Sequence, residues 1–337
     1  MHLDAAVATP PAGGQAATRP PAVAAKGTAP WRFVVLSDIH VYSDGSIPAD
    51  ALAVVRNVTA LHPRFVVITG DSTNGNKGDR FSVRSIDRWW QALHTLLEPL
   101  YAARIPVLSV AGNHDTYRVQ HRDGYAKAWA DQQTYALPFK LRFGRTPFYY
   151  SLDVGSVHLV LLDIVTQHID DTQEKWLEGD LARSNARLKL VFGHVPIQSA
   201  ITHSVTKFRD KMVGLLAKHG VNSYIAGHEH LLWDDTLEVG PHSLRQLTCG
   251  TTSGTYNYGM RPSLVRRHCK ETRCTWPNNG YQFRIRLSNR KQWHRTTALV
   301  VEVREDVSEI VVHPHYLAAD GALKPFTRAP VPATSSP

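Results

Sequence analysis

Five short clusters of Asp, Asn and His side chains carry the chemistry of this sequence. Each follows a run of apolar residues, and several contain a glycine that lets the backbone turn tightly. In chain order the clusters are Asp38-Ile39-His40, Gly70-Asp71, Gly112-Asn113-His114-Asp115, Gly193-His194 and Gly227-His228-Glu229-His230. One such cluster alone is a common turn, but five of them, each placed after an apolar run, indicate a shared site.

The residue types favour a metal site. Carboxylate, imidazole and amide oxygen are ligands of zinc, manganese and iron, and no thiolate stands among them. The candidate ligands are Asp38, His40, Asp71, Asn113, His194, His228 and His230. They are too many for one ion and suit two ions that share a bridging carboxylate. Two ions about 3.5–4 Å apart activate a bridging water for in-line displacement at phosphorus. In a regular strand, the two-residue spacing of Asp38 and His40, and of His228 and His230, would put each pair on one face.

The elements that must position these clusters alternate along the chain. Apolar runs predict strands over 32–37, 65–69, 107–111, 148–152, 158–163, 189–192 and 223–226. Helical periodicity predicts helices over 49–61, 84–103, 172–184 and 205–218. Beyond residue 230 the pattern predicts strands alone, over 232–239, 243–248, 281–287, 297–304 and 308–314. This order indicates an α/β protein with an additional antiparallel sheet, in which ligands bind beyond the carboxyl ends of strands.

The five clusters resemble those of the calcineurin-like metallophosphoesterase family. The family pattern is Asp-x-His, Gly-Asp, Gly-Asn-His-Asp/Glu, a His after a strand, and Gly-His-x-His, and the match spans residues 33–230. The resemblance implies a four-layer α/β fold, with two mixed β-sheets packed face to face and helices on the outside. It also implies two metal ions, of manganese, iron or zinc, and hydrolysis of a phosphoester by in-line attack of a metal-bridging hydroxide.

The resemblance further implies a role for each position. Asp38, His40 and His230 would hold the first metal, and Asn113, His194 and His228 the second. Asp71 would bridge the two metals. His114 would contact the phosphate and protonate the leaving oxygen, and Asp115 would orient His114.

Two positions separate the chain from the purple acid phosphatases, which share most of the pattern. Those enzymes carry Gly where His40 stands, and a ligand Tyr three residues beyond the bridging Asp, where this chain has Asn74. A purple tyrosinate–iron site is therefore not expected. His40 places the chain nearer the bacterial cyclic-nucleotide phosphodiesterase-like branch.

The net charge of +9 over 337 residues is concentrated in one segment. Residues 261–295 hold ten Lys or Arg and one acidic residue, so the rest of the chain is balanced. We expect a disordered Ala/Pro-rich tail over 1–30, one metallophosphoesterase domain over 31–320 that includes the basic insert 261–295, and a disordered tail over 321–337. No apolar window is long enough to span a membrane, and the start lacks the apolar stretch of a secretory signal. We therefore expect a soluble chain, cytoplasmic or exported with its signal removed.

Three segments are candidates for the substrate pocket: 72–83, 116–146 and 250–295. They contribute the candidate substrate contacts Tyr117, Arg118, Tyr256 and Tyr258. Because aromatic side chains stack on bases and guanidinium groups pair with phosphate, a small phosphomonoester or phosphodiester, nucleotide-like in character, is a reasonable substrate. Two alternatives stay open. The basic insert could bind a polyanion such as nucleic acid, or the enzyme could be a nuclease, although a nuclease is expected to spread its basic residues around the site.

Overall fold

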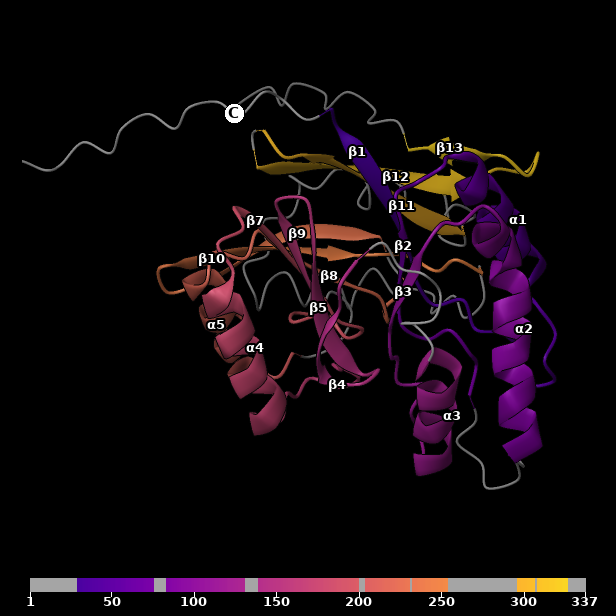
Figure 1. Ribbon diagram of the computed structural model, residues 1–337, viewed down its shortest axis with the longest axis horizontal. Coiled ribbons are helices and arrows are strands. Elements are labelled where there is room, and N and C mark those ends of the chain that lie inside the picture. The colour runs from indigo at the N-terminus through magenta and orange to yellow at the C-terminus, as the bar shows by residue number, and fades with distance from the viewer. Residues whose placement is uncertain are drawn as a thin grey trace, which may run out of the picture.

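We analysed a computed structural model of the chain. The structure describes residues 29–75, 83–130, 139–199, 204–230, 232–253, 296–306 and 308–326. Within these residues, strands form two sheets that lie between two groups of helices (Figure 1).

The first sheet has six strands among the described residues, in the order β13-β12-β11-β1-β2-β3. The bounds are β1 Trp31–Leu36, β2 Val66–Thr69, β3 Val107–Val110, β11 Thr297–Arg304, β12 Glu309–Leu317 and β13 Leu323–Pro325. The three N-terminal strands pair in parallel, while β1–β11, β11–β12 and β12–β13 pair antiparallel. The carboxyl ends of β1, β2 and β3 therefore meet at one edge of this sheet.

The second sheet has seven described strands, in the order β4-β5-β6-β7-β8-β10-β9. The bounds are β4 Arg142–Arg145, β5 Tyr149–Val154, β6 Val157–Leu161, β7 Leu188–Phe192, β8 Ser223–Ala226, β9 Trp233–Val239 and β10 His242–Thr248. Strands β6, β7, β8 and β10 are parallel, and the outer pairs are antiparallel. Both sheets are mixed, as predicted.

Five described helices cover the outer faces of the sheets. Their bounds are α1 Ala49–Ala60, α2 Val83–Ala102, α3 Val119–Trp129, α4 Asp171–Arg183 and α5 Thr206–Lys218. Figure 1 shows α1, α2 and α3 on one flank and α4 and α5 on the opposite flank. Helix α4 begins with a side-chain cap, because the Asp170 carboxylate accepts a hydrogen bond from the Gln173 N–H at 2.9 Å.

Strand alternation explains the four layers. In β1, Phe33 and Val35 point into the core between the two sheets, whereas Val34 and Leu36 point into the core beneath α1 and α2. In β7, Leu190 and Phe192 enter the core between the sheets, and Val191 enters the core beneath α4 and α5. Each central strand thus buries both faces, which is why it reads as a continuous apolar run. The four-layer α/β prediction is confirmed.

Three described elements were not predicted. Helix α3 lies inside 116–146, which we expected to line a pocket, and strands β4 and β13 are short edge strands. Strand β13 pairs with β12 at Leu323 and Lys324, which lie within the segment expected as the C-terminal tail. The strand predicted over 281–287, the basic insert 261–295 and the tail segments 1–28 and 327–337 fall outside the described residues. Among the helices that the structure describes, none combines the length and apolar character needed to cross a membrane.

Candidate metal centre

The seven predicted ligands come from both sheets and lie at the carboxyl ends of parallel strands. Asp38 and His40 follow β1, Asp71 follows β2, and Asn113 follows β3. His194 follows β7, and His228 and His230 follow β8. Their ligand atoms form two groups, one of Asp38, His40, Asp71 and His230 and one of Asp71, His194 and His228.

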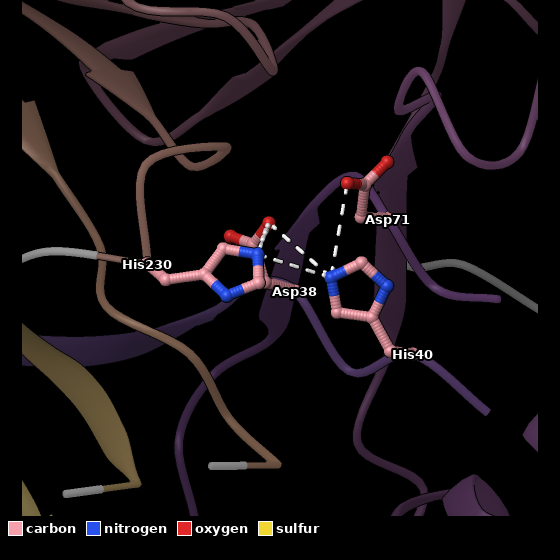
Figure 2. A group of neighbouring side chains, drawn as sticks. All are labelled: Asp38, His40, Asp71 and His230. Atoms are coloured by element: carbon pink, nitrogen blue, oxygen red, sulfur yellow. Dashed lines mark hydrogen bonds and ion pairs between the residues drawn. The ribbon is translucent and has the colours of Figure 1, made fainter. Parts of the chain in front are cut away.

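The first group converges on one point (Figure 2). His40 Nε2 lies 3.1 Å from His230 Nε2 and 3.8 Å from Asp38 Oδ1 and from Asp71 Oδ2. His230 Nε2 lies 3.2 Å from Asp38 Oδ1. All four side chains are almost fully buried, with at most 4% of any of them exposed.

These distances fit a metal ion. Two nitrogen ligands of one tetrahedral zinc, each about 2.0–2.1 Å from it, lie about 3.3 Å apart. The separations of His230 Nε2 from His40 Nε2 and from Asp38 Oδ1 are close to this value. Asp38 Oδ1 is buried, and none of the residues that the structure describes donates a hydrogen bond of normal geometry to it. A buried carboxylate oxygen that faces two imidazole nitrogens calls for a shared cation.

The second group converges on His194. Its Nε2 lies 3.3 Å from Asp71 Oδ1 and 3.0 Å from Asn113 Oδ1. The rings of His194 and His228 meet edge to face, with centroids 5.0 Å apart. Asn113 therefore places an amide oxygen beside this group.

Asp71 belongs to both groups through different oxygens. Its Oδ2 faces His40 Nε2 in the first group, and its Oδ1 faces His194 Nε2 in the second. The Oδ1 atom also accepts a hydrogen bond of 2.8 Å from the His114 backbone N–H. Burial opposes the charge on Asp71, but His194, His40 and His114 outweigh it and lower its pKa. A carboxylate with one oxygen toward each group has the geometry of a bridging ligand.

The backbone of the ligand loops is left-handed at most of these residues. Asp38, His40, Asp71, His228 and His230 have φ values of 51°, 52°, 51°, 70° and 51°. Neither Asp38 and His40 nor His228 and His230 lie in a strand, because β1 ends at Leu36 and β8 at Ala226. The expectation that strand alternation aligns each pair was therefore wrong. Left-handed turns beyond the strand ends bring the side chains together instead.

Two glycines allow the loops to approach each other. A side chain at Gly70, whose φ is +93°, would overlap the His194 ring and the Gly112 backbone. A side chain at Gly112 would overlap the Asp71 backbone and its Oδ1. Only glycine leaves room for the close contact of the loops after β2 and β3 with the ligands.

Hydrogen bonds on the far side of the ligands fix their orientation. His194 Nδ1 pairs with the Thr69 carbonyl at 2.8 Å, which directs Nε2 toward Asp71 and Asn113. The Ser37 hydroxyl donates to Asp38 Oδ2 at 2.6 Å, and the His228 N–H donates to the same oxygen at 3.0 Å. These contacts leave Asp38 Oδ1 to face the histidines. Sequence reasoning missed Ser37, although its place beside a ligand was a usable signal.

Burial sets the charge state of the histidines. Desolvation lowers the pKa of His40 to about 4 and that of His228 to about 4, so both present neutral imidazole lone pairs near pH 7. Burial also opposes the charged form of His194, but the adjacent Asp71 carboxylate outweighs it and raises the pKa of His194 to about 9.

His114 stands at the open side of the two groups. Its Nε2 lies 3.8 Å from Asp71 Oδ2, and 19% of its side chain is exposed. Its Nδ1 lies 2.6 Å from the Asn74 carbonyl oxygen, to which an N–H at that position donates. Because Nδ1 faces a carbonyl, Nε2 is the nitrogen directed at the ligand cluster.

Asp115 binds the backbone of the loop that precedes it and of the loop after β2. Its buried carboxylate accepts hydrogen bonds from the backbone N–H groups of Gly112, Ser72 and Thr73 and from the Thr73 hydroxyl, at 2.9–3.2 Å. Burial and the Asp71 charge raise the pKa of Asp115 to about 7. Asp115 therefore joins the loop after β2 to the loop after β3, and the Asn74 carbonyl accepts the hydrogen bond of His114 Nδ1.

The predicted substrate contacts have different surroundings. Tyr117 is half-buried against Asn113 and His114, and Arg118 is exposed at the start of α3. Tyr256 and Tyr258 lie outside the described residues. Within the expected pocket segment 116–146, His121 is buried against Trp89 and Arg122 pairs with Asp163, so both have structural partners.

The fold and the paired ligand groups define a class of two-metal α/β proteins, and sequence comparison gives the family. The model of the calcineurin-like phosphoesterase family matches residues 32–232. The chain belongs to this family.

Curated relatives include two kinds of enzyme. A probable cyclic nucleotide phosphodiesterase of Moraxella catarrhalis is 28% identical over 66% of this chain and 79% of its own length. Human tartrate-resistant acid phosphatase type 5 is 27% identical over 63% of this chain and 70% of its own length. Purple acid phosphatase 23 of Arabidopsis thaliana is 24% identical over 61% of this chain, a match that spans only 48% of the plant protein.

Solved structures show the same fold. The purple acid phosphatase PPD1 of yellow lupin superimposes with a TM-score of 0.59 at 14% identity, covering 88% of this chain and 53% of the lupin chain. A dimetal phosphatase of Danio rerio superimposes with a TM-score of 0.50 at 14% identity, covering 84% of this chain and 98% of the other.

Proposed function

We propose that this chain is a dinuclear metal-dependent phosphoesterase that hydrolyses small phosphomonoesters or phosphodiesters. The observation that carries the proposal is the pair of buried ligand groups that share Asp71. A single structural ion would need only one of these groups. Asp38, His40 and His230 would hold one ion, Asn113, His194 and His228 the other, and Asp71 would contribute an oxygen to each.

Two ions bound in these groups would supply an activated water and neutralise the charge of a phosphoryl group. The protein supplies the acid. His114 Nδ1 donates to the Asn74 carbonyl, so a proton delivered from Nε2 must come from the imidazolium form. After Nε2 gives this proton to the leaving oxygen, the ring is neutral and keeps its Nδ1–H. Its partial exposure gives the imidazole access to solvent, from which it is reprotonated.

The proposed substrate class has a general part, a small phosphoester, and a narrower part, a nucleotide-like phosphoester. The ligand groups and His114 support any small ester in which a phosphoryl group faces the ions. A nucleotide-like substrate rests on the aromatic and basic residues of 250–295, of which Tyr256, Tyr258 and the basic insert lie outside the described residues.

The test compares wild type with Asp71→Asn and His114→Ala on nitrophenyl and phenyl esters, as both monoesters and diesters, with zinc, manganese or iron. Asp71→Asn should weaken binding at both groups and abolish turnover. His114→Ala should lower turnover of the phenyl esters by about 10²–10⁴-fold, because their poor leaving groups need the proton, and of the nitrophenyl esters much less.

His62→Asn is the matched control. His62 is exposed in a left-handed turn after α1, and asparagine tolerates that conformation. This variant should behave as wild type. Unchanged turnover in both Asp71→Asn and His114→Ala would contradict the two-metal assignment. Salt-dependent DNA binding that persists in Asp71→Asn, without hydrolysis by wild type, would support the polyanion-binding alternative.

A further inference from the structure

Tyr117 lies between the two residues that border the open side of the ligand cluster. Its hydroxyl lies 3.2 Å from Asn113 Nδ2, which donates to it. Its ring is tilted against the His114 ring, with centroids 4.7 Å apart. The ring also lies close to Gly75, where an added Cβ would stand 3.3 Å from Tyr117 Cδ2. Tyr117 is thus held between the loops that follow β2 and β3.

We propose that Tyr117 is a positioning residue of the metal centre, which acts through Asn113 and His114. This inference rests on the proposed function, since Asn113 must be a ligand for its orientation to matter. It replaces the expectation that Tyr117 serves chiefly as a substrate contact.

The carboxamide of Asn113 needs such a partner. A carboxylate ligand presents an oxygen in either rotation, but rotation of an amide exchanges its oxygen for an NH₂ group. The last torsion of asparagine is broad, so the side chain itself does little to prevent this exchange. With Nδ2 held by the Tyr117 hydroxyl, Oδ1 faces His194 Nε2 at 3.0 Å, the side on which an ion would bind. A turned amide would place its NH₂ group on that side, and an amide NH₂ group does not bind a metal ion.

The ring of Tyr117 has a second effect. His114 is fixed at Nδ1 by the Asn74 carbonyl but can still tilt about that bond. The rings of His40 and Tyr117 pack against it from different directions, each with its centroid 4.7 Å away. The hydroxyl and the ring therefore have separate effects. The hydroxyl holds a metal ligand, and the ring limits the motion of the acid.

Two substitutions separate these effects. Tyr117→Phe removes only the hydroxyl, and Tyr117→Leu removes the ring as well. The metal-free proteins are titrated with zinc by isothermal titration calorimetry, and turnover is measured at saturating zinc. Tyr117→Phe should weaken one of the two sites by about 10-fold, the lower end of the effect of removing a group that orients a ligand. The affinity of the other site should stay at the wild-type level. Tyr117→Leu should show the same loss of affinity, together with a lower kcat on phenyl esters.

A control variant and a broken-site background complete the test. Tyr42→Phe changes an exposed tyrosine, 37% accessible, and should leave both affinities unchanged. In a His228→Ala background, where the second group is already broken, Tyr117→Phe should have no further effect on the remaining site. If wild type binds two ions and Tyr117→Phe binds both as tightly, the inference is overturned. If wild type itself binds no metal, the proposed function fails instead.

Discussion

At the scale of the residue, the ligands occupy an unfavourable backbone conformation that their neighbours hold in place. Left-handed φ values at non-glycine residues cost roughly 1–3 kcal/mol each. Backbone hydrogen bonds between adjacent loops compensate for this cost, for example from Asp38 N–H to the Gly70 carbonyl at 3.1 Å and from His40 N–H to the Asp71 carbonyl at 3.0 Å. The loops after β1 and β2 thus fix each other and hold Asp38, His40 and Asp71 in their left-handed conformations.

Gly112 gives a direct test of this close approach. Gly112→Ala should displace Asp71, the shared ligand, because the added Cβ would overlap its backbone and Oδ1. We expect weaker zinc binding at both groups and a fall of about 1–3 kcal/mol in the free energy of unfolding. Calorimetric zinc titration and urea unfolding measure the two effects.

Gly214→Ala is the control for this substitution. Gly214 lies in α5 with no atom within 4 Å of an added Cβ, so alanine should stabilise the protein by up to about 1 kcal/mol and leave zinc binding unchanged. Wild-type zinc affinity in Gly112→Ala would show that the loops can separate without loss of the site.

At the scale of the element, the strands that carry ligands were predictable and the peripheral elements were not. The central strands bury both faces, and this leaves an apolar run in the sequence that ends at a polar cluster. Strand β4 is half-exposed, and β13 has three residues at a sheet edge. Helix α3 buries His121, Gly124, Tyr125 and Trp129, and Gly124 fits closely against Ile86 and Trp90 of α2. These buried positions have helical spacing, but His121 and Gly124 are not large apolar residues, so hydrophobic periodicity did not reveal the helix.

In the candidate site, too, some features could be predicted from the sequence and others could not. The ligands were predictable because metal chemistry restricts residue type. The partners of His114 and Asp115 were not, because hydrogen bonds between distant loops decide them. The Asn74 carbonyl takes the position beside His114, and the Asp115 carboxylate turns to the N–H groups of the loop after β2.

A buried ion-pair network joins β6 to α4 far from the ligands along the strands. His158 of β6 is fully buried and lies between Asp153 Oδ1 at 2.8 Å and Asp180 Oδ2 at 3.0 Å. Asp180→Ala should lower the free energy of unfolding by about 3–5 kcal/mol, because it leaves the buried His158 without its buried carboxylate partner, whereas the other partner, Asp153, is half-exposed. Asp87→Ala, which removes an exposed partner of Lys127, should cost less than about 1 kcal/mol. Urea unfolding at pH 7 compares the two.

The stabilisation that Asp180 contributes should depend on pH with a definite sign. Burial opposes the charge of Asp180, but His158 and Ser151 outweigh it and lower its pKa in the folded protein. A lowered folded pKa stabilises the protein above the unfolded value of about 3.9, and the stabilisation is lost as the pH falls below it. The difference between wild type and Asp180→Ala should therefore shrink below about pH 4. A difference that stays constant down to pH 3 would contradict the ion-pair account.

At the scale of the whole molecule, the candidate metal centre lies where the two sheets meet. The first sheet supplies Asp38, His40, Asp71 and Asn113, and the second supplies His194, His228 and His230. Each group takes ligands from both sheets: His230 meets Asp38 in the first, and His194 meets Asp71 in the second. An ion in either group would thus bind the folded arrangement of the sheets and not the unfolded chain.

This arrangement couples metal binding to global stability. A free ion concentration of about 100 times the Kd stabilises the folded state by about 2.7 kcal/mol for one site, which for a domain of roughly 290 residues raises Tm by about 4–5 °C. Wild type should therefore unfold at a lower temperature in EDTA than in excess zinc, as measured by circular dichroism. Asp71→Asn should lose most of this increase, because Asp71 belongs to both groups, whereas Asp87→Asn should retain it. A Tm that is the same with and without metal, in a wild-type protein shown by calorimetry to bind two ions, would mean that the ions do not hold the sheets together. The ligands would then bind the ions equally well in the unfolded chain. Such binding is unfavourable, because Asp38 and His230 are far apart in the sequence and bringing them together in an unfolded chain costs loop-closure entropy.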